Sequence, residues 1–328
     1  MTHFAASVIS NSRVSSRYFE LNFSWHALPP TPGQFITLRL SDGPVPLLRR
    51  PFAVSAFEDS PTAARGAKDT GAVHGEAAGE SPPASTAAII YEERGRGTRL
   101  LQAAGPGDSL DVLGPLGVPF PAPKTSGTPV LIAGGAGLGP LLFLYTALTR
   151  GRGRPAGRLP EQHGESPPAP GAAPPAPADA RPAPDTVEAP DAAGAAPPAP
   201  AVAPLFVFGA RDASAVPPWL EDRGALIATE DGSLGARGTA LDVLLDRLPS
   251  LRDPELFVCG PHPMLQAVAG LASEHGLRCW VSMEQTMGCA VGACLGCVVP
   301  LASADAETSY ARVCTEGPVF DSRSIRWE

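Results

Sequence analysis

The chain has 328 residues, of which 44% are apolar, and carries a formal net charge of −8. The apolar content permits a sizeable buried core, and the acidic balance argues against nucleic acid as a main partner. The sequence opens without a basic segment followed by an apolar run, and no apolar stretch is long enough for a bilayer, so we expect a cytoplasmic chain with no membrane association.

Short segments of alternating polarity, separated by turn residues, fill the first 123 residues. We expect strands in RYFELNF (17–23), GQFITLRL (33–40), FAVSAF (52–57), AAIIYE (87–92) and SLDVLGPLG (109–117). Several short strands with close turn signals are typical of a small antiparallel β-barrel. Residues 58–86 are small and polar, and they predict a disordered insert within this barrel.

Two motifs in this region could bind phosphate. Arg49 and Arg50 precede an apolar strand, where a fixed guanidinium suits a phosphate and the neighbouring Phe52 could lie against a flavin ring. The alternative is a solvated charge pair before an edge strand. Gly97 and Thr98 begin an expected helix, and their amides could hold a second phosphate oxygen. Each motif is weak by itself.

From residue 128 the pattern changes to buried apolar strands that alternate with helices. We expect strands in 129–134, 205–210, 225–230, 255–260 and 278–283, and helices after the first strand and in 238–248 and 262–276. This alternation predicts a doubly wound parallel sheet over residues 128–283. Residues 151–204 predict a disordered insert between a helix and the next strand, because Pro167–Pro204 holds 13 Pro and 15 Ala in 38 residues. It should lie away from the ligand-binding edge.

The segment AGGAGLGP (133–140) lies between the first of these strands and its helix. Its glycines would let the backbone approach a pyrophosphate, and the helix N-terminus would offer its amides. The glycines are Gly134, Gly135, Gly137 and Gly139. Their spacing differs from G-x-G-x-x-G, so a tight turn without a ligand is the alternative.

Cys259, Gly260 and Pro261 end a later strand, in a position to touch a nicotinamide. A small buried thiol at a turn is the simpler interpretation of Cys259 alone, and Cys279 should be a core residue. Arg211 follows the strand 205–210, where it could meet a 2′-phosphate and favour NADP(H), or be merely solvated.

The strongest signal is a cysteine motif near the end of the chain. Cys289, Cys294, Cys297 and Cys314 follow the C-x4-C-x2-C…C spacing of plant-type [2Fe-2S] sites. Two irons need four thiolates, and soft sulfur ligands suit iron. Structural zinc is the competing interpretation, but all-cysteine zinc sites usually bring two C-x2-C pairs, and only Cys294 and Cys297 form one. The loop should follow the last strand of the sheet without holding the two larger domains together.

This order of motifs resembles the ferredoxin-reductase-like flavoproteins, and among them the electron transfer subunits of NAD-dependent (class 1B) dihydroorotate dehydrogenase. The resemblance covers nearly the whole chain except the two inserts. It is carried by PGQF, LLRRP, GTRLL, DVLGPLG, GGAGLGP, TEDGSLG, CGPHPML, SMEQTMGCAVGACLGC and CTEGPVF.

The resemblance implies three cofactors, and it assigns no catalytic residue to this chain. FAD would lie on the barrel, residues 1–123, at positions matching Arg50, Pro51, Phe52, Ala53, Ile90, Tyr91, Glu92, Gly97 and Thr98. NAD(H) would bind the α/β domain, residues 128–283. A [2Fe-2S] cluster would occupy a C-terminal domain, residues 284–328, on the four cysteines named above.

The resemblance also implies a partner, a catalytic subunit with FMN that oxidises dihydroorotate in pyrimidine biosynthesis, assembled as a heterotetramer. Electrons would run from dihydroorotate through FMN, the cluster and FAD to NAD+. Two positions depart from the family pattern: Ala53 lacks a usual hydroxyl, and Glu92 replaces a frequent arginine. Two alternatives stay open. The first is a flavin and iron–sulfur subunit of another complex, such as a ferredoxin:NADP oxidoreductase, a sulfide dehydrogenase or a hydrogenase. The second is a zinc-loop interaction module.

Overall fold

The computed structural model describes residues 1–40, 48–59, 85–124, 126–150, 202–302 and 309–327. Most of both expected inserts lies outside these residues, so their disorder stays a prediction. The ends of the first insert differ from expectation, because Glu58 still belongs to one strand while Ser85 and Thr86 begin the next.

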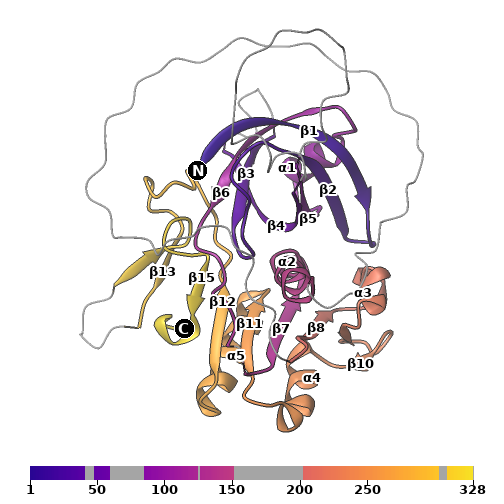
Figure 1. Cartoon of the computed structure of the whole chain (residues 1–328), viewed down its shortest axis with the longest axis vertical. Helices are drawn as coiled ribbons and strands as arrows, with labels where there is room; N and C mark the ends of the chain where they lie inside the picture. Colours follow the sequence, from indigo (N-terminus) through magenta and orange to yellow (C-terminus); the bar gives the residue numbers. More distant parts are fainter. Residues whose placement is uncertain (41–47, 60–84, 125, 151–201, 303–308, 328) are drawn as a thin grey trace, which may run out of the picture.

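Six antiparallel strands close into a barrel in the order β1-β2-β5-β4-β3-β6, drawn at the top of Figure 1. They are β1 (Thr2–Arg13), β2 (Tyr18–Trp25), β3 (Phe35–Arg39), β4 (Arg50–Glu58), β5 (Ser85–Glu92) and β6 (Ser109–Leu116), with helix α1 (Arg96–Gln102) after β5. The five expected strands are confirmed. The additional strand β1 closes the barrel, since its first half pairs with β6 and its second half with β2.

The second unit is a seven-stranded sheet in the order β10-β9-β8-β7-β11-β12-β15. Its strands are β7 (Pro129–Gly134), β8 (Leu205–Ala210), β9 (Leu226–Thr229), β10 (Ala236–Arg237), β11 (Glu255–Cys259), β12 (Arg278–Ser282) and β15 (Val319–Asp321). All neighbours pair in parallel except β12 and β15. The helices are α2 (Leu138–Thr149), α3 (Trp219–Asp222), α4 (Ala240–Arg247) and α5 (His262–Glu274).

Helices cover both faces of this sheet, as the alternating pattern predicts. On one face, side chains such as Val130 and Val258 pack with Leu244 of α4 and Leu265 of α5. On the other face α2 lies between the sheet and the barrel, and its apolar residues share a core with Tyr18 and Ile90 of the barrel (Figure 1). The helix α2 is buried on nearly every side because it has a protein layer above and below it.

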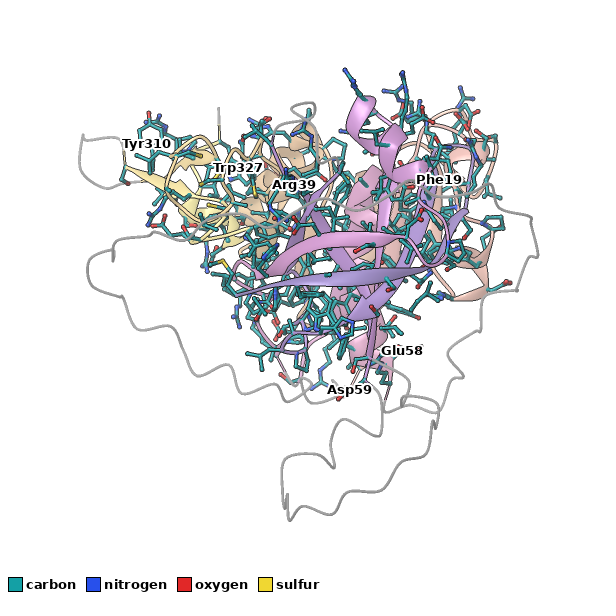
Figure 2. The ribbon with its side chains drawn as sticks, turned by 90° about the horizontal axis from the view of Figure 1, so that it is seen from above. Phe19, Arg39, Glu58, Asp59, Tyr310 and Trp327 are labelled. Carbon is teal, nitrogen blue, oxygen red and sulfur yellow. The ribbon has the colours of Figure 1, made fainter. Side chains whose placement is uncertain are left out.

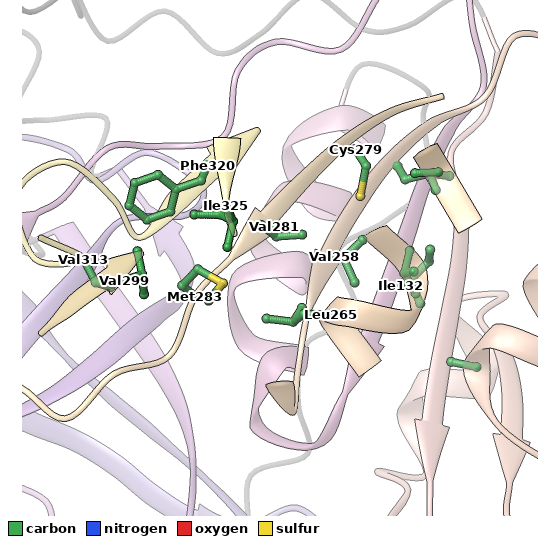
Figure 3. Packing of buried hydrophobic residues seen from close by; sticks show 14 of the residues in the cluster. Ile132, Val258, Leu265, Cys279, Val281, Met283, Val299, Val313, Phe320 and Ile325 are labelled. Atoms are coloured by element: carbon green, nitrogen blue, oxygen red, sulfur yellow. The ribbon is translucent and has the colours of Figure 1, made fainter. Parts of the chain in front are cut away.

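The C-terminal segment returns to the sheet after the cysteine loop. The expectation that this loop follows the last strand of the sheet is therefore wrong. Val319–Asp321 pairs antiparallel with β12, beyond the short hairpin of β13 (Val298–Pro300) and β14 (Tyr310–Arg312). Figure 3 shows one continuous core that runs from the sheet to this segment, through Val281, Met283 and Phe320. Three residues are too few for alternating polarity to reveal such a strand.

The same segment also touches the end of the barrel. The amide of Val118 donates to the carbonyl of Gly317 at 2.6 Å, and a side chain at Gly117 would lie 2.6 Å from the Pro318 ring. Figure 2 shows this segment, with Tyr310 and Trp327, at one side of the barrel and Phe19 at the other. The cysteine region is therefore packed against both larger units. The expectation that it does not hold them together stays a prediction.

Candidate functional site

The four cluster cysteines come together as two pairs. The Cys294 amide donates to Cys289 Sγ at 3.3 Å, and the Cys314 thiol lies in hydrogen-bond contact with Cys297. Within the described ranges, no three His, Cys, Asp or Glu side chains surround a single point closely enough for one metal ion. Two thiol pairs are the division of ligands that two irons need, so these residues fit a two-iron cluster.

The loop backbone turns its amides towards the first pair. Ala290 and Leu295 have φ of 61° and 55°, which is the left-handed region that non-glycine residues seldom occupy. A side chain at Gly288 would lie 3.2 Å from Cys294 Sγ, so the close approach of this backbone to the sulfur favours glycine. Successive amides in such turns form concave sites for anions.

These amides change the acidity of the thiols. Burial raises the pKa of Cys289, but hydrogen bonds from the Val291 and Cys294 amides outweigh it and lower the pKa to about 7. For Cys314, burial and the neighbouring Cys297 raise the pKa to about 11. The loop amides therefore favour the thiolate form of Cys289, which is the form that binds a metal.

On the barrel, the structure separates the two arginines that the sequence places side by side. The Arg49 guanidinium is paired with the carboxylate of Asp111 and donates to the Thr37 carbonyl at 3.2 Å. Arg50 instead lies along α1, where its Nε would be 3.5 Å from a Cβ at Gly97. Only Arg50 is thus placed beside the expected phosphate-binding turn.

The other residues that the sequence predicts to bind the flavin divide between the two faces of the barrel wall. Tyr91 belongs to the barrel core, and the half-buried Phe52 packs edge-on against it with ring centroids 6.1 Å apart. Ile90 points the other way, into the core shared with α2, and Ala53 is half-buried. The expected contact of Phe52 with a flavin ring stays a prediction. Ile90 packs towards the α/β unit, and the Ala53 carbonyl oxygen lies 3.9 Å from where a Cβ at Gly139 would be.

Thr98 holds the start of α1 with its hydroxyl. This oxygen accepts hydrogen bonds from the amides of Arg94 at 2.9 Å and Gly95 at 3.2 Å. Its contribution to phosphate binding would come from its amide. The hydroxyl fixes the backbone that precedes the helix, including Arg94.

The glycine turn is packed directly against the turn after β11. A Cβ at Gly137 would lie 2.1 Å from the Cys259 carbonyl oxygen, and one at Gly134 would lie 2.7 Å from the Met264 sulfur. Gly135 has φ of 61°, while a Cβ at Gly139 would make only ordinary contacts, the nearest at 3.5 Å. The expected glycine turn and the Cys259 turn thus meet at the carboxyl edge of the sheet, where ligands bind in such folds.

Both cysteines of the sheet are buried thiols. Burial raises the pKa of Cys259 far above its ordinary value, with the Glu284 carboxylate adding to the effect. Burial also raises the pKa of Cys279 to about 12, which agrees with its expected place in the core. Both side chains therefore stay protonated at neutral pH.

Sequence reasoning missed Tyr18, which connects the barrel to the glycine turn. It begins β2, is 4% exposed, and places its hydroxyl 3.5 Å from where a Cβ at Gly135 would lie. Burial, together with the carboxylates of Glu92 and Glu284, raises the pKa of Tyr18 to about 12. Only the packing of the barrel on the sheet brings these residues together, so no spacing in the sequence could reveal them.

Comparisons with known proteins agree with this arrangement. A family model described as the iron-sulfur cluster binding domain of dihydroorotate dehydrogenase B matches residues 284–326. The dihydroorotate dehydrogenase B (NAD(+)) electron transfer subunit of Bacillus caldolyticus is 30% identical over 327 residues, which cover 97% of this chain and 96% of the relative. The chain belongs to this family of electron transfer subunits. The subunit of the same name from Geobacillus thermodenitrificans is 30% identical over 322 residues, with 97% and 96% covered.

Solved structures support the fold. The structure of an NADH-dependent reduced ferredoxin-NADP oxidoreductase has a TM-score of 0.64 at 19% identity, covering 98% of this chain and 89% of that chain. A ferredoxin reductase of carbazole 1,9a-dioxygenase has a TM-score of 0.53 at 16% identity, covering 84% and 66%. The predicted barrel, parallel sheet and C-terminal cluster region are thus confirmed as the architecture of this subunit.

Membership in the family confirms the expected class, an oxidoreductase subunit that transfers electrons, and agrees with the expected set of FAD, a [2Fe-2S] cluster and NAD. The family model favours iron–sulfur over the zinc alternative. It also implies a catalytic partner, because the relatives are named as subunits. Among the described helices, none has both the length and the apolar character needed to cross a membrane.

Proposed function

We propose that this subunit passes electrons from a separate dihydroorotate-oxidising subunit to NAD+, as a step of pyrimidine biosynthesis in the cytoplasm. The bound groups would supply the redox chemistry, since a one-electron cluster can link two flavins and a flavin can form a hydride from single electrons. The protein's own residues would bind these groups, set their separation and exclude water between them.

The observation that carries the proposal is the pairing of the four cysteines on a segment packed against both larger units. Cys289, Cys294, Cys297 and Cys314 would hold the cluster. That segment touches the barrel at Val118 and pairs with the sheet through β15, so its position relative to both is fixed. An electron carrier needs such fixed distances.

On the barrel, Arg50 and the backbone at Gly97 and Thr98 would hold the FAD phosphates, with Pro51, Ala53, Ile90 and Glu92 along its edge. The tightest support is the placement of the Arg50 side chain against Gly97, where a side chain would meet Leu40 at 3.2 Å. Phe52 and Tyr91 would act indirectly, by packing the strands that carry the residues in contact with FAD.

The glycine turn, through Gly134, Gly135, Gly137 and Gly139, would bind NAD(H) together with the turn of Cys259, Gly260 and Pro261. The support is the contact between the two turns at the carboxyl edge of the sheet. Arg211, the candidate for binding a 2′-phosphate, is exposed. The neighbouring Asp212 accepts a hydrogen bond from the Ser214 amide at 2.9 Å. Asp212 would repel a 2′-phosphate, which favours NAD(H) over NADP(H).

The partner would be an FMN-containing dihydroorotate dehydrogenase, and the assembly a heterotetramer. Co-expression of the two chains, followed by affinity purification through this subunit, tests both points. We expect equimolar FAD and FMN, a cluster spectrum and a mass equal to two copies of each chain. Co-purification of a different redox partner without FMN would replace this proposal with the alternative complex.

A further inference from the structure

Glu92, at the end of β5, holds two arginines from different parts of the barrel. Arg94 donates through Nε to Glu92 Oε2 at 2.7 Å, and Arg17 Nη1 lies 3.5 Å from Glu92 Oε1. The Glu92 side chain is only 15% exposed, whereas those of Arg94 and Arg17 are 66% and 40% exposed. An acid at this position therefore anchors two accessible guanidinium groups.

The backbone around both arginines is fixed. The Arg94 amide donates to the Thr98 hydroxyl at 2.9 Å, which ties it to the start of α1. In the turn before β2, the Ser16 amide donates to the Ser214 carbonyl at 2.9 Å, and the hydroxyls of these two serines are also 2.9 Å apart. Arg17 is therefore held against the α/β unit by its immediate neighbour.

Tyr18 connects the two arginines to the glycine turn. Tyr18 pairs with Glu92 in the β2–β5 register, and its hydroxyl is 3.5 Å from where a Cβ at Gly135 would lie. Arg17 and Arg94 both act on the Tyr18 hydroxyl electrostatically. The charged groups that face this hydroxyl are thus Arg17, Arg94, Glu92 and the carboxylate of Glu284.

We propose that Arg94 and Arg17, oriented by Glu92, bind the pyrophosphate of the nicotinamide dinucleotide from the barrel side, opposite the glycine turn. The inference rests on the proposed function and names the residues that complete its nucleotide site. A pyrophosphate carries two negative charges, and guanidinium groups match phosphate oxygens with paired donors. The glycine turn offers amides on one side, and the two arginines offer cations on the other.

The arrangement explains the departure at Glu92. An arginine in that position would place three like charges together, whereas Glu92 attracts both guanidinium groups and leaves the three side chains with a net positive charge. Since Glu92 is neutralised by them, it does not repel the nucleotide as a free carboxylate would.

The test compares Arg94→Gln and Arg17→Gln with the wild type in the FAD-loaded protein, by titrating NAD+ and ADP-ribose and following flavin absorbance or heat. We expect each variant to raise the Kd of both probes about tenfold, because each loses a charge-assisted hydrogen bond to a phosphate. Arg94→Lys, which keeps the charge, should recover part of the affinity. The Kd of FAD, measured by reconstituting the apoprotein, should change far less than that of the probes, by no more than about threefold.

Arg323→Gln is the matched control. Arg323 is 65% exposed and pairs with a carboxylate two residues earlier, Asp321, at 2.6 Å, as Arg94 does with Glu92. Its substitution should leave the Kd of both probes within about twofold.

Three outcomes would overturn the inference. If the wild type binds NAD+ and both glutamine variants bind it equally well, the arginines do not contact the nucleotide, while the proposed function stands. If the Kd of FAD rises instead, the pair serves the flavin. If the wild type itself binds neither probe, the proposed function fails and the inference fails with it.

Discussion

The packing of the glycine turn on the Cys259 turn makes Gly137→Ala the most informative single substitution. The added Cβ would lie 2.1 Å from the Cys259 carbonyl oxygen and 2.7 Å from the Gly260 nitrogen, where ordinary contact begins at 3.4 Å. Both atoms belong to the backbone, so neither can swing aside as a flexible side chain could. The two turns must therefore separate by about 1 Å.

Overpacking of this kind costs about 1–3 kcal/mol, and rigid backbone neighbours put Gly137→Ala near the upper end. The better backbone propensity of alanine offsets about 0.5–1 kcal/mol, which leaves a net loss of about 2 kcal/mol. For a unit of this size, such a loss lowers Tm by roughly 4–8 °C. Thermal unfolding followed by circular dichroism measures the shift, and titration with NAD+ measures the accompanying loss of affinity.

Gly139→Ala is the control, because its Cβ would meet nothing closer than Ser55 at 3.5 Å and it lies within α2. Its stability should equal that of the wild type or exceed it by up to about 1 kcal/mol. A Gly137→Ala protein with wild-type Tm and unchanged affinity for NAD+ would refute the described contact between the two turns.

Three further predictions test other parts of the structure. Arg50→Gln should weaken FAD binding at least tenfold, because it loses a charge-assisted contact. Arg49→Gln should lower stability but leave the Kd of FAD unchanged, because Arg49 is bound to the barrel. An equal loss of FAD affinity in both variants would contradict the separation of their roles. Glu20 is buried, burial raises its pKa above the ordinary 4.5, and Oε2 has no hydrogen-bond partner within the described residues. Because the raised pKa makes ionisation of Glu20 unfavourable in the folded state, Glu20→Gln should stabilise the protein by about 1–2 kcal/mol near pH 8. This gain in stability should vanish as the pH falls towards the ordinary pKa of a glutamate. A gain that does not depend on pH, measured by urea unfolding, would refute this prediction. Replacing Pro167–Pro204 with a short Gly/Ser loop should keep NADH-dependent dye reduction within about twofold, since the tract joins the end of α2 to the amino end of β8, and a large loss would reveal a role for it.

Most strands and helices of the fold could be predicted because their apolar residues are regularly spaced. The buried runs 129–134, 205–210 and 255–260 are each flanked by turn residues, and each is a strand of the sheet. β1 escaped prediction because its inward positions include small residues such as Ala6, whose contrast with the outward polar residues is weak. β15 is too short to show a pattern.

For the candidate site, local spacing was sufficient only where the chemistry is local. The cysteines at 289, 294 and 297 share one loop, and their spacing alone indicates the cluster. The different roles of Arg49 and Arg50 depend on Asp111, a residue of β6 that only the closed barrel brings near. The anchoring of Arg94 and Arg17 by Glu92 likewise needs the pairing of β2 with β5.

The central claim, that this subunit carries electrons between its partner and NAD+ through the cysteine-bound cluster, is tested by Cys297→Ser in the purified complex. Cys297 is 2% exposed within the core that joins the loop to the sheet, and serine fills nearly the same space, so FAD and the partner should stay bound. We predict a disturbed cluster spectrum, preserved reduction of a flavin-accepting dye by NADH, and collapse of NAD+-linked dihydroorotate oxidation. Full NAD+-linked turnover in a complex that has lost its cluster but kept its partner would contradict the account and leave the cysteines a structural role.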